Sequence, residues 1–331
     1  MNVYFCAAFL IVFFMKRIAF VFLVLVCLTA FVSCNKNGVF RPKENISSIW
    51  YESEEVAMFL RDSSTVKTVV KKYKMEDWEW DGKDLKTRIV YNRDNSEKYN
   101  YVYEYNKENR IIGITSPLEK KTRIRFIYND DKKIKEIKYF TETFSENDLP
   151  YRKIEFTYDG NKVMSIKETI NNQKYPRSYA VAPSLLSYLV SEDMAEEIEA
   201  NTVRPKIEYN VVTKDYVFEW DGKNISKVTI TTNAGGNPSV ANISYTYDEK
   251  KNPFMARVTG YVEDEGVSYT IASKNNVVSC SYSDDSEMTI TEDCQYTYDK
   301  KYPVAKMVER VRKTANALTT TKATYTYEYL K

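Results

Sequence analysis

The sequence predicts a mainly β protein, built as an extended, twisted antiparallel sheet of repeated β-hairpins. Tyrosine occurs 28 times and phenylalanine 15 times, whereas glycine and proline occur only 9 times each. Aromatic residues favour strands, and Gly and Pro interrupt them. One stretch is also nearly repeated, as IEFTYDGNKVMSI from Ile154 and YVFEWDGKNISKV from Tyr216. Repetition of this kind predicts an array of small structural units.

Each copy of the repeated pattern has the features of one hairpin. Two aromatic residues at i and i+2 share a face of a strand, and the Asp-Gly or Asn-Asp that follows is a turn signal. Two aliphatic residues three apart start the return strand. Because this spacing does not alternate, we place the first of them at the turn exit or in a β-bulge. The copies begin at Trp78, Tyr103, Phe126, Phe156, Phe218, Tyr245, Tyr296 and Tyr325, with a degenerate copy at Tyr269.

The repeat is interrupted once, and the array begins and ends with a half-unit, which is a single strand of a hairpin. Residues 183–200, PSLLSYLVSEDMAEEIEA, predict a short helical insertion. The array begins on a return strand at Ile46 and stops on YTYEY from Tyr325. These halves would pair if the sheet closed into a barrel, or they would be the two edges of an open or partly rolled sheet. The irregular spacing favours the open form.

The N-terminal segment predicts export and lipid attachment. Residues 1–33 contain no acidic side chain, and Lys16 and Arg17 precede a long apolar run, which indicates a signal peptide whose true start is Met15. The sequence FVSC ending at Cys34 resembles the lipobox of bacterial lipoproteins, which implies an acylated cysteine. An ordinary signal peptide or a retained helix is the alternative. Residues 34–44 would form a tether and residues 45–331 a single repeat domain.

The repeated Tyr-x-Tyr-Asp units, such as YTYD from Tyr245 and from Tyr296, resemble YD-type repeats. Together with the lipobox, the chain is similar to YD-repeat-like lipoproteins of the Bacteroides group, many of which have no known function. The resemblance covers residues 46–330. It implies a shell or scaffold, and it carries no shared catalytic residues.

Charge and composition narrow the function classes. Removal of Lys16 and Arg17 with the signal peptide leaves 46 basic residues against 46 acidic ones, so the sequence gives no basic excess for nucleic acid. The chain has no histidine, the commonest general base and metal ligand. We therefore predict no catalytic residue, no metal and no cofactor.

Two groups of polar residues have alternative interpretations. Cys280 and Cys294 would form a disulfide across neighbouring strands in an oxidising compartment; a reactive thiol or two free inert thiols are the alternatives. Asp81, Asp159 and Asp221 each precede a glycine, which predicts turns. Two such carboxylates would also suffice for a glycoside hydrolase.

The aromatic pairs also have two interpretations. They would form ladders that stabilise the sheet, or an exposed platform that binds sugar rings or a partner. The residues of the predicted platform are Trp78, Trp80, Tyr103, Tyr105, Phe218 and Trp220.

The function that follows is a non-enzymatic, lipid-anchored outer-membrane protein that binds a partner protein or a glycan. The residues after Cys34, NKNGVFRP, contain no acid, which favours the periplasmic face. The alternatives are a carboxylate-dependent glycoside hydrolase and a carrier that holds an apolar ligand in a curved sheet.

Overall fold

The computed structural model describes residues 45–116, 122–140, 149–171, 194, 198, 211–236, 238–251, 273–300 and 302–330. The predicted signal peptide, Cys34 and the tether lie outside these residues, as does the 183–200 insertion apart from Met194 and Ile198. Those two residues have helical backbone and are buried in the hydrophobic core. Within the described part of the chain, no helix has the length and apolarity needed to cross a membrane.

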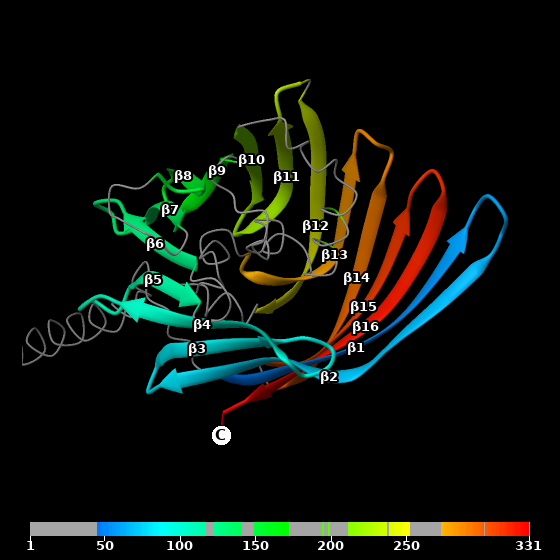
Figure 1. Ribbon diagram of the computed structural model, residues 1–331, viewed down its shortest axis with the longest axis horizontal. Helices are drawn as coiled ribbons and strands as arrows, with labels where there is room; N and C mark the ends of the chain where they lie inside the picture. Colours follow the sequence, from blue (N-terminus) through cyan, green and yellow to red (C-terminus); the bar gives the residue numbers. More distant parts are fainter. Residues whose placement is uncertain are drawn as a thin grey trace, which may run out of the picture. The chain divides into compact units, whose positions relative to one another are not determined.

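Sixteen antiparallel strands make up nearly all of the described chain (Figure 1). They are β1 (Ile46–Phe59), β2 (Thr65–Asp81), β3 (Asp84–Tyr91), β4 (Glu97–Tyr105), β5 (Ile111–Ser116), β6 (Thr122–Tyr128), β7 (Ile134–Phe140), β8 (Arg152–Asp159), β9 (Lys162–Asn171), β10 (Val211–Asp221), β11 (Asn224–Asn233), β12 (Ser239–Lys251), β13 (Asn275–Asp284), β14 (Thr289–Asp299), β15 (Tyr302–Lys313) and β16 (Ala317–Tyr329).

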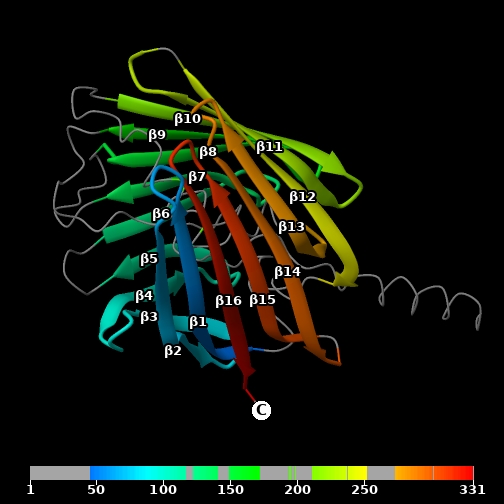
Figure 2. The same cartoon turned by 90° about the vertical axis from the view of Figure 1, so that its right-hand side faces the viewer.

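The sheet closes into a barrel. Each strand pairs with its sequence neighbours, and β1 pairs with β16 from Ile46 opposite Tyr329 to Phe59 opposite Ala317 (Figure 2). The mainly β class with antiparallel hairpin repeats is confirmed, but the preference for an open sheet is wrong. The two half-units meet because each supplies the hydrogen-bonding edge that the other lacks. The irregular spacing changes only the lengths of strands and turns.

The predicted turns and bulges are confirmed. Gly82, Gly160 and Gly222 have φ of +60°, +54° and +57°, a region that glycine adopts without strain. The pairing register shifts at the second aromatic residue of the repeat, as between Thr157 and Tyr158 in β8. The aliphatic residue after each turn therefore lies at a bulge, which explains why the spacing of three does not alternate.

The two faces of the sheet have different chemistry. On β8, Ile154 is fully buried in the hydrophobic core, whereas Lys153 and Glu155 face outward and form an ion pair at 2.9 Å. Successive side chains of a strand point to opposite faces. The aromatic pairs share the face of Ile154 and pack into or against the same core.

Candidate functional site

The six residues of the predicted platform lie inside the barrel. Trp78, Tyr103 and Phe218 are buried, with 4%, 6% and 1% of their surface exposed. The other three, Trp80, Tyr105 and Trp220, are half-buried and pack against the core. The expectation of a flat, exposed aromatic face is therefore wrong, because closure turns this face of the sheet inward. The aromatic rings are available to a ligand only through the interior.

The aromatic residues have a repeated structural role as hydrogen-bond donors. Around the barrel, eight tyrosine or tryptophan side chains donate to a backbone carbonyl of the preceding strand, at 2.6–3.0 Å. The donors and acceptors are Trp80 to Ile46, Tyr105 to Leu85, Tyr128 to Ile111, Tyr158 to Ile134, Trp220 to Val163, Tyr247 to Ile225, Tyr296 to Val277 and Tyr329 to Pro303.

These bonds explain the composition of the repeat. A β-bulge interrupts the ladder and leaves a backbone group in need of a partner. The acceptor Ile111, for example, lies at the register shift between Glu104 and Tyr105. In six of the eight copies the donor is the second aromatic residue, which is Tyr or Trp, whereas the first is Phe in three copies. The last two copies donate through Tyr296 and Tyr329 instead. The aspartate that follows belongs to the turn.

We expect Tyr128→Phe to lower the free energy of unfolding by about 1–3 kcal/mol, because the Ile111 carbonyl would lose its donor. Tyr245→Phe is the control. The Tyr245 hydroxyl is buried, and the described residues give it no hydrogen-bond partner, so its removal should be neutral or slightly stabilising. Urea denaturation of both variants checks this. Equal losses would contradict the assigned role of the hydroxyl.

Three buried arginine–glutamate pairs face the interior, and the sequence analysis missed them. Arg88 contacts Glu76 through two nitrogens, at 2.7 and 2.9 Å. Arg152 Nε lies 2.6 Å from Glu168 Oε1, and Arg310 Nε lies 2.7 Å from Glu292 Oε1. All six side chains are at most 7% exposed. A buried charge without its partner is costly, so loss of one partner from any of these pairs should destabilise the barrel.

The Arg152–Glu168 pair has the most complete surroundings. The Tyr216 hydroxyl donates to Glu168 Oε2 at 3.0 Å, and the Arg152 guanidinium lies 4.8 Å from the centre of the Tyr139 ring. Burial alone would raise the pKa of Glu168, but the charges of Arg152 and Lys214 outweigh burial and hold this pKa below its ordinary value of 4.5. Glu168 is therefore ionised at neutral pH.

The lowered pKa of Glu168 predicts sensitivity to acid. Its contribution to stability is present above the unfolded pKa of 4.5 and is lost as the pH falls through the lower folded pKa. We expect the free energy of unfolding to fall below about pH 4. A variant with methionine at 152 and 168 and phenylalanine at 216 should lose less stability over this range. An identical pH profile would contradict the assignment.

Cys280 and Cys294 are free and buried, so the predicted disulfide is not formed. In the β13–β14 register Cys280 lies opposite Glu292, two residues from Cys294. Diagonal neighbours have Cβ atoms about 7 Å apart, beyond the reach of a disulfide. Burial raises the pKa of both thiols, which disfavours the reactive thiolate.

We expect folded chain 35–331 to react negligibly with a thiol reagent over minutes, since both thiols are buried and protonated. After denaturation without reductant, both cysteines should react. Addition of reductant to the denatured chain provides the control. A gain in thiols on reduction would show that the two cysteines are bridged.

The carboxylates of the repeat do not converge. Asp81, Asp159 and Asp221 are exposed at three separate turns. The described residues contain no cluster of three Cys, Asp or Glu side chains that would hold a metal.

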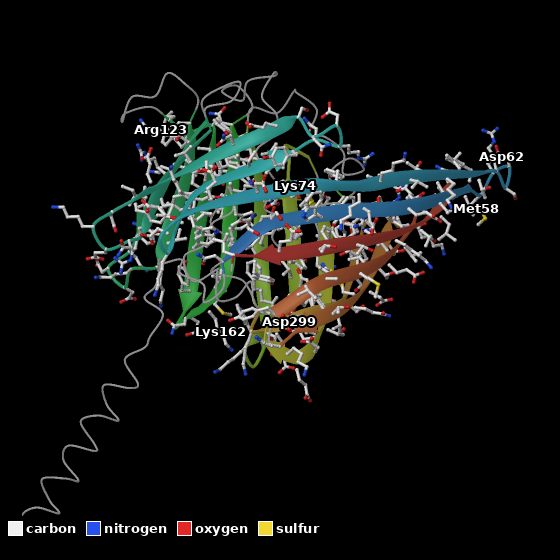
Figure 3. All side chains as sticks on the ribbon, turned by 90° about the horizontal axis from the view of Figure 1, so that it is seen from below. Met58, Asp62, Lys74, Arg123, Lys162 and Asp299 are labelled. Carbon is white, nitrogen blue, oxygen red and sulfur yellow. The ribbon has the colours of Figure 1, made fainter. Side chains whose placement is uncertain are left out.

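The β1–β2 hairpin exposes apolar side chains that have no role in the core. Figure 1 shows that it extends past the end of β3, and Figure 3 places Met58 and Asp62 near its tip. Five of its large apolar side chains are 37% to 59% exposed. These residues are Val56, Phe59, Leu60, Val66 and Val69. Apolar surface gathered in this way indicates an interaction site.

Comparison with known proteins gives no family. No protein-family model matches the chain, and no curated protein sequence matches it. Among solved structures, a porin-like protein from Bacteroides uniformis is similar over 84% of this chain and 97% of its own length, with 11% identity and a TM-score of 0.43.

Two toxin structures are also similar. A TcdB2-TccC3 structure is similar over 76% of this chain, with 14% identity and a TM-score of 0.27. The Photorhabdus luminescens Tc holotoxin pore is similar over 79% of this chain, with 12% identity and a TM-score of 0.26. This chain spans only 14% and 16% of the length of those two chains.

Proposed function

We propose that the protein is a non-catalytic, lipid-anchored barrel of the cell envelope that presents its β1–β2 hairpin to a partner protein. The exposed apolar surface of that hairpin carries the proposal. Val66 and Val69 are 53% and 59% exposed, on a strand that extends beyond its neighbour β3. Exposed apolar side chains gathered on one projecting element favour a protein partner over a role in the core.

Attachment through a lipid is supported by the outer wall of the barrel. Outward-facing ion pairs lie on several strands, among them Lys153–Glu155, Lys138–Glu136 and Lys227–Glu219, at 2.9–3.5 Å. A barrel that spans a membrane instead presents an apolar band to the lipid. A charged wall suits water, so membrane attachment would come from acylated Cys34.

The buried charges support a structural rather than a catalytic role. The carboxylates of Glu76, Glu168 and Glu292 are each held by an arginine. Acid–base chemistry needs a carboxylate directed at a substrate. This arrangement disfavours the glycoside hydrolase. The carrier would need an open, apolar interior, and the inward aromatic side chains named above instead bond to the barrel wall.

Lipid attachment is tested with Cys34→Ser. The wild-type protein should incorporate labelled palmitate and remain with membranes in high salt, whereas the variant should do neither. Protease added to intact cells should spare the wild-type protein and degrade it after outer-membrane permeabilisation, as expected for the periplasmic face. Palmitate incorporation by Cys34→Ser would contradict lipidation at this residue.

Partner binding is tested by affinity capture from envelope extracts with chain 35–331. Val66→Ser/Val69→Ser should lose the proteins that the wild-type chain retains. Val217→Ser/Met307→Ser is the matched control, since these two residues are 51% and 47% exposed on other strands. Equal retention by both double variants would refute the hairpin as the binding surface. Binding to a glycan array that survives the hairpin substitutions would favour a glycan ligand elsewhere.

A further inference from the structure

Part of β2 has an unpaired edge. β1 pairs with β2 from Thr65 to Asp77, whereas β3 pairs only with Glu76–Asp81. Among the described strands, residues 65–72 therefore have a partner on one side only. Seven of their eight side chains are exposed and Val70 is half-buried. Such an edge presents backbone N–H and C=O groups that can pair with another strand.

The positive charge of residues 65–72 favours some partner strands over others. Residues 65–72, TVKTVVKK, contain three lysines and no acid. Lys67 Nζ lies 2.8 Å from Glu54 Oε2, and Lys72 Nζ lies 5.7 Å from the centre of the Trp50 ring. Lys71, which lies between them in the sequence, is exposed. Two copies paired edge to edge would place like charges together, which is destabilising. An acidic strand would instead match the lysines.

The apolar residues of the same edge complete the recognition surface. Val69 shares a face with Lys67, and Val66 lies on the opposite face, by the alternation of a strand. An alternating strand added here would cover Val66 with its apolar residues and would place its acidic residues on the other face, beside Lys67. Backbone pairing would supply affinity, and the alternating side chains would supply specificity.

We propose that the β2 edge from Thr65 to Lys72 receives an extended, acidic segment of a partner protein as an added β-strand. This inference rests on the proposed function and names how the partner binds. The segment alternates apolar residues with Asp or Glu. It lies along the edge of β2 that faces away from β1.

The probe is a labelled ten-residue peptide in which glutamate alternates with valine and threonine. Hydrogen exchange of chain 35–331 should show new amide protection confined to residues 65–72 when the peptide binds. Lys67→Glu/Lys71→Glu/Lys72→Glu should weaken binding about tenfold or more, as three exposed ion pairs would. Lys86→Glu/Lys135→Glu is the matched control, since these exposed lysines lie on strands paired on both sides, and it should leave affinity unchanged.

Three results would overturn strand addition. The first is equal binding of a peptide N-methylated at every residue, which has no backbone N–H to donate along either edge. The second is equal binding of a peptide with lysine in place of glutamate. The third is concentration-dependent self-association through residues 65–72, which would make a second copy the occupant. If the chain retains an envelope protein through its hairpin but the peptide gives no protection, strand addition alone fails; if it retains none, the proposed function fails.

Discussion

Replacement of Arg152 by methionine is expected to destabilise the barrel by about 3–5 kcal/mol. The substitution leaves the Glu168 carboxylate in a site where its side chain is only 2% exposed. Its remaining described hydrogen bond comes from the Tyr216 hydroxyl. That donor cannot replace the full charge of a guanidinium, so Glu168 must either remain ionised at high cost or bind a proton.

A variant without the ion pair distinguishes two causes of this loss of stability. One is the unpaired charge of Glu168, and the other is the loss of the packing contacts of the Arg152 side chain. Arg152→Met/Glu168→Met/Tyr216→Phe removes both charges and the hydroxyl that would lose its acceptor, so it should recover most of the stability. Lys153→Met is the control for the neighbouring outward position, where its ion pair with Glu155 is exposed and should contribute at most about 1 kcal/mol. Urea unfolding at neutral pH measures all three. A triple variant as unstable as Arg152→Met would contradict the interpretation.

Phe218→Ala is expected to lower the free energy of unfolding by about 3–5 kcal/mol. Phe218 is 1% exposed on β10 and belongs to the barrel core. Removal of the ring leaves a cavity that the closed wall cannot easily fill, because strands on both sides hold β10 in register. The loss therefore includes the cost of the cavity as well as that of the lost apolar burial.

The adjacent residue provides a control on the same strand. Val217 is 51% exposed and points outward, so Val217→Ala should change stability by less than about 0.5 kcal/mol. Thermal and urea unfolding compare the two variants. Similar small effects for both would mean that Phe218 faces solvent, as the predicted platform required, and would refute the inward orientation.

Local features of the fold were predictable from the sequence because they depend on nearby residues. Asp-Gly at 159–160 specifies a turn, and the spacing of Val163 and Ile166 indicates a bulge. The structure confirms the positive φ of Gly160 and the register shift at Tyr158. The composition of the repeat also indicates the hydrogen bonds from aromatic side chains to the backbone. A second aromatic residue that is always Tyr or Trp indicates a required donor.

The buried ion pairs had a weaker signal in the sequence. In RKIEFTY, Arg152 has the same strand parity as Ile154, Phe156 and Tyr158, so it shares their face. A charge on an aromatic face suggests a buried partner. The partner Glu168 lies on the following strand, diagonal to Arg152 in the register, and only the pairing of β8 with β9 identifies it.

The sequence by itself determined the hairpin unit, its turns, its bulges and the set of residues that share a face. These depend on the period of a strand and on residues a few positions apart. Only the tertiary structure decided that β1 meets β16, and hence that the aromatic face turns inward. That contact joins residues at the two ends of the repeat array, and no local preference encodes it. Only the tertiary structure also shows that β2 runs on beyond the shorter β3, which leaves residues 65–72 with a partner on one side among the described strands.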